Sequence, residues 1–178
     1  MRFRFKIVIF AVGKCNKTMN MKSKKVMKKT YVLMLSQSFP TKHPRSGNPT
    51  GFRKKFLSGE KRHTIRTNFP LWAKRIHEVQ QGEAVISVRQ WEARPYFSRQ
   101  ITIGCLTAES GTGIQKLTFQ LDRDGCASFN FFDIDGKYPE LKELAANDGL
   151  SADDWKEWFR GYDFSKPMAV IQFGKFRY

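Results

Sequence analysis

The sequence predicts an α+β fold in which about six mixed or antiparallel strands form a small β-barrel flanked by helices. Segments with alternating apolar and polar residues follow one another with short turns between them, which favours antiparallel pairing. Segments with apolar residues at helical spacing lie before, between and after these strands. The only Gly-rich loop, Gly111 to Gly113, precedes a strand and is interpreted as a turn, so neither a P-loop nor a dinucleotide-binding fold fits.

The positive charge is unevenly distributed along the chain. The 178 residues carry a formal net charge of +16, which points to anionic partners, nucleic acid first. Residues 1–33 hold 10 of the 32 Lys and Arg residues and none of the 16 Asp and Glu residues. Residues 34–178 are therefore only moderately basic, with 22 basic residues against 16 acidic ones. We expect two parts, a basic arm over 1–33 and one globular domain over 34–178.

Three interpretations of residues 1–33 remain open. The apolar run from Ile7 to Val12 resembles the start of a secretory signal, but Lys14, Asn16 and Lys17 stand where a small-residue cleavage site should follow. A disordered basic arm fits the like charges better. We favour a start codon further downstream, at one of four methionines: Met19, Met21, Met27 or Met34.

The three cysteines, Cys15, Cys105 and Cys126, form no CxxC pair and suggest no disulfide framework. We therefore expect a cytoplasmic protein with neither a metal nor a cofactor. No apolar segment is long enough to span a membrane, so we expect no membrane association, and we expect a monomer.

The first half of the domain begins with an expected strand over Val32–Phe39, which Pro40 ends. After a loop over residues 40–49, Phe52, Phe56 and Leu57 lie at helical spacing and predict a short helix. Gly59 ends it, in a position that tolerates a left-handed backbone. The alternation from His63 to Arg66 then predicts a strand, so Lys61 falls where a helix gives way to a strand.

The second half continues with helices and strands in alternation. Trp72, Ile76 and Val79 predict a helix over residues 71–81. Ser151 is the expected N-cap of a late helix, with Asp154 in the place of the usual Glu of a capping box. The remaining expected elements are strands over residues 84–91, 96–106, 116–121, 126–132 and 168–173, and helices from 139 and from 151.

The stretch Gly59-Glu60-Lys61-Arg62-His63-Thr64-Ile65-Arg66 resembles the Gly-x-Lys-x-x-Thr-x-Arg signature of ASCH domains, a branch of the PUA-like superfamily. Gly82-Glu83-Ala84-Val85 is similar to a strand entry of that family, and the segment from Trp155 to Phe173 resembles its closing helix and strand. The resemblance covers about residues 34–173. It implies a PUA-like barrel with a basic cleft that binds RNA, a nucleotide or a modified nucleoside, with Lys61, Thr64 and Arg66 as ligand-binding residues.

One ASCH subgroup removes the acyl group from N4-acetylcytidine, so the resemblance also implies an alternative function as an amidohydrolase. Carried over, Lys61 is the general base and Thr64 the nucleophile. The subgroup has a Glu on a later strand, where this chain has Gln100 to Ile103 and no carboxylate. Glu92 and Glu109, at the ends of that hairpin, are the candidate substitutes.

Aromatic residues provide further candidates for ligand contacts. Trp91 and Tyr96 flank a turn with Arg89, Arg94 and Arg99 nearby, and rings mixed with cations suit single-stranded nucleic acid. We therefore add Trp91 and Arg89 to the expected binding residues. Two other interpretations remain open: a packing cluster at the barrel rim for these aromatics, and a protein-interaction module with an acidic partner for the whole domain.

Overall fold

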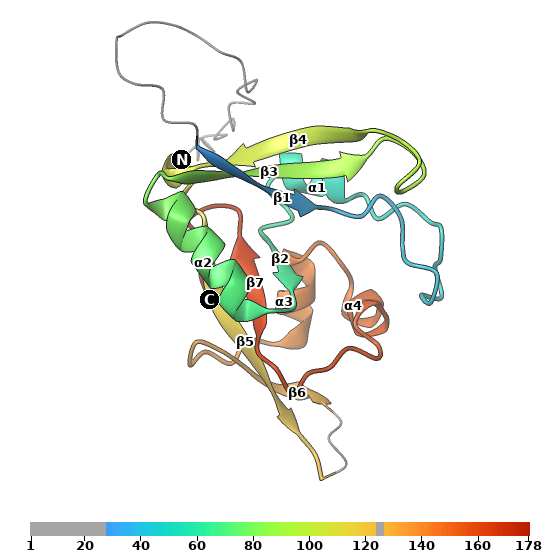
Figure 1. Cartoon of the computed structure of the whole chain (residues 1–178). Helices are drawn as coiled ribbons and strands as arrows, with labels where there is room; N and C mark the ends of the chain where they lie inside the picture. The colour runs from blue at the N-terminus through green and yellow to red at the C-terminus, as the bar shows by residue number, and fades with distance from the viewer. Residues whose placement is uncertain (1–27, 124–126) are drawn as a thin grey trace, which may run out of the picture.

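The structure is a computed structural model that describes residues 28–123 and 127–178. It has the predicted α+β class, with seven strands and four α-helices in this part of the chain (Figure 1). The helices are α1 (Phe52–Leu57), α2 (Phe69–Gln80), α3 (Leu141–Asn147) and α4 (Ala152–Trp158), and a 3-10 turn, η1, spans Ala108–Ser110. The strands are β1 (Lys29–Met34), β2 (His63–Arg66), β3 (Ala84–Trp91), β4 (Gln100–Leu106), β5 (Gly113–Leu121), β6 (Ala127–Ile134) and β7 (Met168–Gln172).

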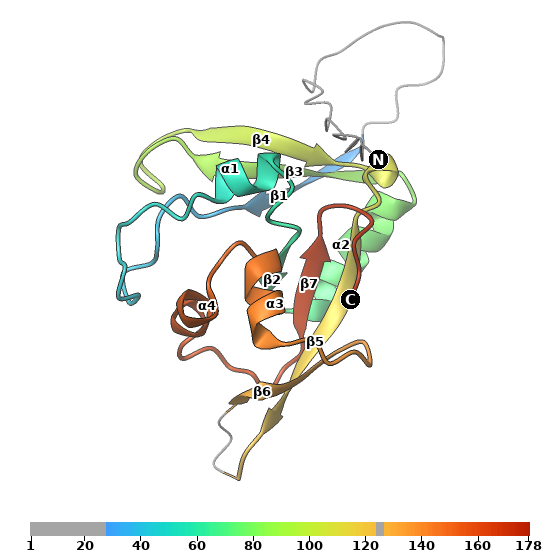
Figure 2. The same cartoon turned by 180° about the vertical axis from the view of Figure 1, so that it is seen from behind.

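The strands form two sheets, drawn one above the other in Figure 1, with α2 beside both. The three-stranded sheet has the order β1-β3-β4, and the four-stranded sheet has the order β2-β7-β5-β6. β7 lies inside the second sheet, antiparallel to β2 and β5, and all five of its residues are buried. Its apolar sequence suits a strand covered on both faces. Figure 2 shows α3 and α4 beside this sheet, on the side away from α2.

The strands of the expected small β-barrel do not close in the part of the chain that the structure describes, where they form two separate sheets. Phe56 of α1 occupies the space between them. A Cβ atom added at Gly104 of β4 would lie 2.6 Å from the Phe56 ring, and the same ring packs against Phe173, just after β7, at 5.0 Å between centroids. Close packing leaves no room there for β4 to reach a strand of the other sheet.

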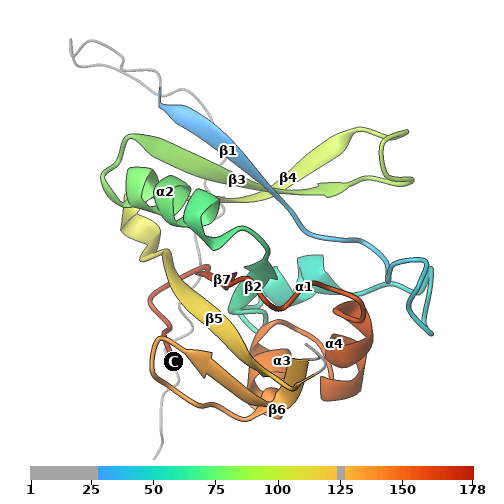
Figure 3. The same ribbon diagram turned by 60° about the horizontal axis from the view of Figure 1, so that its bottom comes forward.

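β1 spans Lys29–Met34, whereas the first strand was expected over Val32–Phe39, so the strand begins and ends earlier than predicted. It runs parallel to β3, with Lys29 opposite Ala84 and Met34 opposite Arg89. Parallel pairing with a strand far along the chain cannot be seen in a local pattern, which explains the error in the boundaries. Five residues assigned to the arm, 29–33, thus belong to the folded domain, and Figure 3 shows β1 lying along β3. Residues 1–27 lie outside the described residues.

Several local predictions are confirmed. Gly59 has a φ of 76°, in the left-handed region, directly after α1. The Ser151 hydroxyl accepts a hydrogen bond from the Asp154 amide at 3.1 Å and caps α4. The strand expected over residues 126–132 is found as β6, Ala127–Ile134, which is only partly buried, since Phe131 is exposed. In the part of the chain that the structure describes, no helix is long and apolar enough to cross a membrane.

Candidate functional site

A pocket of about 440 Å³ is lined by residues from both sheets and from the segments around α3 and α4. Its size falls in the range of small-molecule sites in proteins. Thr64 and Arg66 of β2 line it, as does Asp148 after α3. Six aromatic residues also line the pocket: Phe52, Trp91, Tyr96, Trp158, Phe159 and Tyr162.

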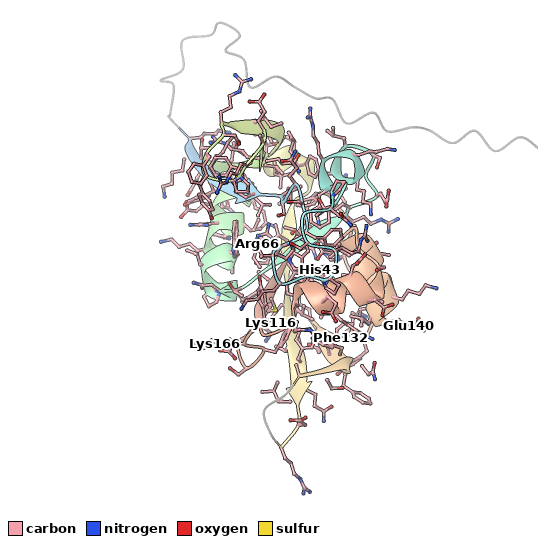
Figure 4. All side chains as sticks on the ribbon, turned by 90° about the vertical axis from the view of Figure 1, so that its right-hand side faces the viewer. His43, Arg66, Lys116, Phe132, Glu140 and Lys166 are labelled. Atoms are coloured by element: carbon pink, nitrogen blue, oxygen red, sulfur yellow. The ribbon has the colours of Figure 1, made fainter. Side chains whose placement is uncertain are left out.

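Thr64 and Arg66 reach the pocket together because residues two apart on a strand share a face. Arg66 Nη1 donates to Thr64 Oγ1 at 2.8 Å and to the Ile65 carbonyl at 2.7 Å, and Nη2 donates to the carbonyl of Met34. The guanidinium thus links β2 to the end of β1. Figure 4 shows Arg66 near the centre of the molecule. These bonds use three of the five N–H groups of the side chain.

Lys61 is buried and does not line the pocket. Its Nζ donates to the carboxylate and to the backbone carbonyl of Asp148, and lies 4.1 Å from the centroid of the Phe52 ring. The turn after α1 holds it there, since the Lys61 amide donates to the Lys55 carbonyl at 2.9 Å. Asp148 and Phe52, which both contact Lys61, line the pocket and lie between it and the Lys61 side chain.

Burial controls the ionisation of this cluster. Loss of water around Lys61 lowers its pKa to about 8, although Asp148 favours the charged form. Burial also raises the pKa of Asp148, while Lys61 opposes the shift. The pKa of Arg66 is lowered by burial too, but a guanidinium stays protonated at neutral pH. Lys61 is paired with Asp148 behind the pocket wall, so Arg66 is the one cation among the residues that line the pocket.

Asp148 is the carboxylate that sequence reasoning missed. The run from Asn147 to Gly149 indicated only the end of a helix, and Asp148 is indeed the residue that follows the last turn of α3. In the sequence, Asp148 is one acidic residue at the end of a helix, 87 positions from Lys61, and nothing in that pattern links the two. The tertiary fold brings the two together, and their side chains are 0% and 5% exposed.

The two glutamates expected as substitutes do not line the pocket. Glu92 forms an exposed ion pair with Arg99, at 2.8 Å between Oε2 and Nε. Glu109 accepts a hydrogen bond from the Thr107 hydroxyl at 2.6 Å, in η1. These contacts lower the pKa of both glutamates. Both carboxylates are therefore ordinary surface acids and are not suited to a proton transfer near neutral pH.

Of the two residues proposed from the β3–β4 hairpin, Trp91 lines the pocket and Arg89 does not. Arg89 donates to Ser87 Oγ at 2.9 Å and to Gln100 Oε1 at 3.3 Å. Gln100 lines the pocket, so the link between Arg89 and the pocket is this hydrogen bond to the Gln100 side chain. Gln100 is the residue of this strand that faces the site, in the region where the resemblance placed a Glu.

His63, between Lys61 and Thr64, belongs to the opposite face of β2. Its Nε2 lies 2.7 Å from the hydroxyl of Tyr178, and burial lowers the pKa of His63 well below its usual value. A neutral, buried imidazole of this kind packs the core and takes no part in the pocket. Among the described residues, no group of three or more His, Cys, Asp or Glu side chains could hold a metal ion.

No family model, no curated protein and no solved structure matches this chain.

Proposed function

We propose that this chain is an ASCH-type domain of the PUA-like superfamily that binds RNA or a nucleotide-sized ligand in the pocket around Thr64 and Arg66. The observation that carries the proposal is the combination, in one pocket of about 440 Å³, of six aromatic residues with the Arg66 guanidinium and the Asp148 carboxylate. Bases stack on aromatic rings, and a guanidinium suits phosphate and base oxygens.

The polar groups of the pocket complement a nucleobase. Two N–H groups of Arg66 have no partner among the hydrogen bonds that hold it, and both can donate to a base or phosphate oxygen. The Asp148 carboxylate accepts from an amino group, and the Gln100 amide can both donate and accept. A ligand with adjacent donors and acceptors and a flat apolar face fits these features together.

Calorimetry of the full chain against the four ribonucleosides and their 5′-monophosphates tests the proposal. We expect binding of at least one of them, and weaker binding in Tyr162→Ala, because a lost stacking ring costs about 1–3 kcal/mol. Tyr162 is 42% exposed, so the substitution leaves the core intact. Tyr138→Ala, which removes a tyrosine that is 79% exposed and outside the pocket, is the matched control.

Equal affinities for the Tyr162→Ala and Tyr138→Ala variants would place the ligand elsewhere. If no nucleoside, nucleotide or RNA bound the chain at low salt, the proposed function would be wrong.

A second function, hydrolysis of N4-acylated cytidine, is favoured by one observation: a hydroxyl and a carboxylate, Thr64 and Asp148, line the same pocket. In this proposal Thr64 is the nucleophile and Lys61 the general base, and the lowered pKa of Lys61, about 8, supports the base role. Against this role, the Lys61 ammonium contacts Phe52 and Asp148 and does not line the pocket.

Chromatography tests this second function. N4-acetylcytidine incubated with the full chain should yield cytidine, and Thr64→Ala should abolish cytidine formation whereas Thr118→Ala should not. Unchanged turnover in Thr64→Ala would exclude this mechanism.

A further inference from the structure

The turn between β3 and β4, residues 92–99, carries two of the most exposed aromatic side chains that the structure describes. Tyr96 is 86% exposed and Phe97 is 76% exposed. Exposed large apolar side chains that lie together indicate a binding surface more often than isolated ones do. The Tyr96 ring also packs against Trp91, at 5.4 Å between centroids, so one side of it is supported and the other is open.

The backbone of this turn is held in an unusual conformation. Tyr96 has a φ of 66°, in the left-handed region that bulky residues rarely adopt. Ser98 stabilises the turn from inside, because its hydroxyl donates to the Arg94 carbonyl at 2.9 Å and accepts from the Ala93 amide at 3.0 Å. The ion pair of Glu92 and Arg99 closes its base. Strain that the surrounding contacts maintain is common where a side chain has to be presented to a ligand.

Tyr96 connects the turn to the pocket, since it lines the pocket and is also exposed. Phe97 is the next residue and does not line the pocket. The Arg94 guanidinium lies over one face of the Phe97 ring, 4.4 Å from its centroid, so a base can stack only on the opposite face. The Trp91 and Tyr96 rings thus pack together at the pocket, and the exposed Phe97 follows Tyr96 directly in the chain.

The turn carries a net positive charge, which favours a negatively charged partner. Residues 89–100 include three arginines, Arg89, Arg94 and Arg99, and a single acid, Glu92. Only one of these cations, Arg99, is neutralised by the glutamate. Aromatic rings on a positively charged surface are the combination that binds single-stranded nucleic acid without reading its sequence.

We propose that this turn is a stacking platform for a second base of a single-stranded RNA whose first base occupies the pocket. The inference rests on the proposed function and narrows it, because it makes the ligand a strand and not a free nucleoside. In this arrangement one base enters the pocket beside Tyr96, the adjacent base stacks on Phe97, and Arg94 neutralises a phosphate of that strand.

The test measures the affinity of the full chain and of two variants for two sets of ligands. The first set is four fluorescently labelled hexaribonucleotides, each built from one kind of base, and the second is the four ribonucleosides. Phe97→Ala removes the platform ring without changing a pocket residue. Phe131→Ala is the matched control, because Phe131 is 63% exposed and lies on β6, in the other sheet. Both variants keep residues 1–33, so any binding by that basic segment is equal in the two.

We expect at least one hexamer to bind more tightly than its nucleoside, and Phe97→Ala to lower hexamer affinity about 5- to 150-fold, the range for one lost stacking ring. Nucleoside affinity should be unchanged in both variants. If hexamers bind no more tightly than nucleosides, or if Phe97→Ala lowers hexamer affinity no more than Phe131→Ala does, the platform is wrong and the pocket proposal survives. If neither ligand binds, the proposed function fails, and the platform fails with it.

Discussion

Two hairpins of this molecule expose large aromatic side chains, yet their surroundings differ. The β3–β4 turn carries Tyr96 and Phe97, and the β5–β6 hairpin and the segment after it carry Phe131 and Tyr138. The first lies beside the pocket and has three arginines against one glutamate over residues 89–100. The second, over residues 122–138, has four aspartates against one arginine and one lysine. In Figure 1 the two hairpins point to different ends of the molecule.

The difference shows that exposure of an aromatic ring does not define a site by itself. The end of the molecule with β1, β3 and β4, which we call the pocket end, combines exposed rings with a pocket and with the three arginines of residues 89–100. The other end, with β5 and β6, is acidic and would repel phosphate groups. Four predictions test whether the two ends differ in this way.

A chain that begins at Met34 should lose the fold of the pocket end. It lacks most of β1, including Leu33, which is 1% exposed, and Tyr31, whose hydroxyl donates to Glu78 at 2.6 Å. Loss of one buried leucine alone costs about 2–5 kcal/mol. Urea unfolding followed by circular dichroism should show a reduced or absent transition, whereas a chain that begins at Lys28 should unfold like the full chain. Equal stability of the two shortened chains would exclude a structural role for β1.

Asp148→Ala should destabilise the protein by about 3–5 kcal/mol, because it leaves the Lys61 ammonium buried without its partner. The control at the other end is Asp133→Ala. Asp133 accepts an exposed hydrogen bond from the Gly136 amide at 2.8 Å, so its loss should cost about 1 kcal/mol. Urea midpoints at pH 7 provide the comparison. Similar losses in the two variants would contradict the buried pair.

Lys61 should make the protein more stable as the pH rises from about 8 to about 10.5. Its pKa is about 8 in the folded protein and 10.5 for a lysine side chain surrounded by water, so in this window the unfolded state binds the additional proton. The free energy of unfolding then increases with pH, by at most about 3 kcal/mol. Urea unfolding of the full chain across this range should show the increase relative to Lys61→Met. Parallel pH profiles of the two proteins would show that Lys61 keeps an ordinary pKa.

The charge difference between the hairpins predicts the smallest effect. Arg94→Gln should reduce the slope of log affinity against log salt concentration by about 0.7 for a single-stranded hexaribonucleotide, the effect of one lost phosphate contact. Lys137→Gln removes a cation from the segment after β6, at the other end, and should leave the slope unchanged. Fluorescence titrations between low and physiological salt measure both. A larger change in Lys137→Gln would place the nucleic acid at the acidic end.

Much of the secondary structure could be predicted because it depends on neighbours in sequence. The spacing of Phe52 and Phe56 indicated α1, Gly59 its end, and Ser151 the start of α4. The motif residues Thr64 and Arg66 could be assigned to one face of a strand for the same reason. The carboxylate of the site could not be found in this way, since Asp148 follows an unrelated helix and only the fold places it against Lys61.

The α+β class and most of the helices and strands could be assigned from the amino-acid sequence alone. The resemblance pointed to Lys61, Thr64 and Arg66 as residues of one cleft, and of these Thr64 and Arg66 line the pocket. The tertiary structure decided that the strands form two sheets, that β1 begins at Lys29, and that Lys61 is buried behind Asp148 and Phe52. The reason is physical: helical and strand periodicities are local, whereas parallel pairing, ion-pair burial and the wedge of Phe56 between the sheets arise from contacts between residues far apart in the chain.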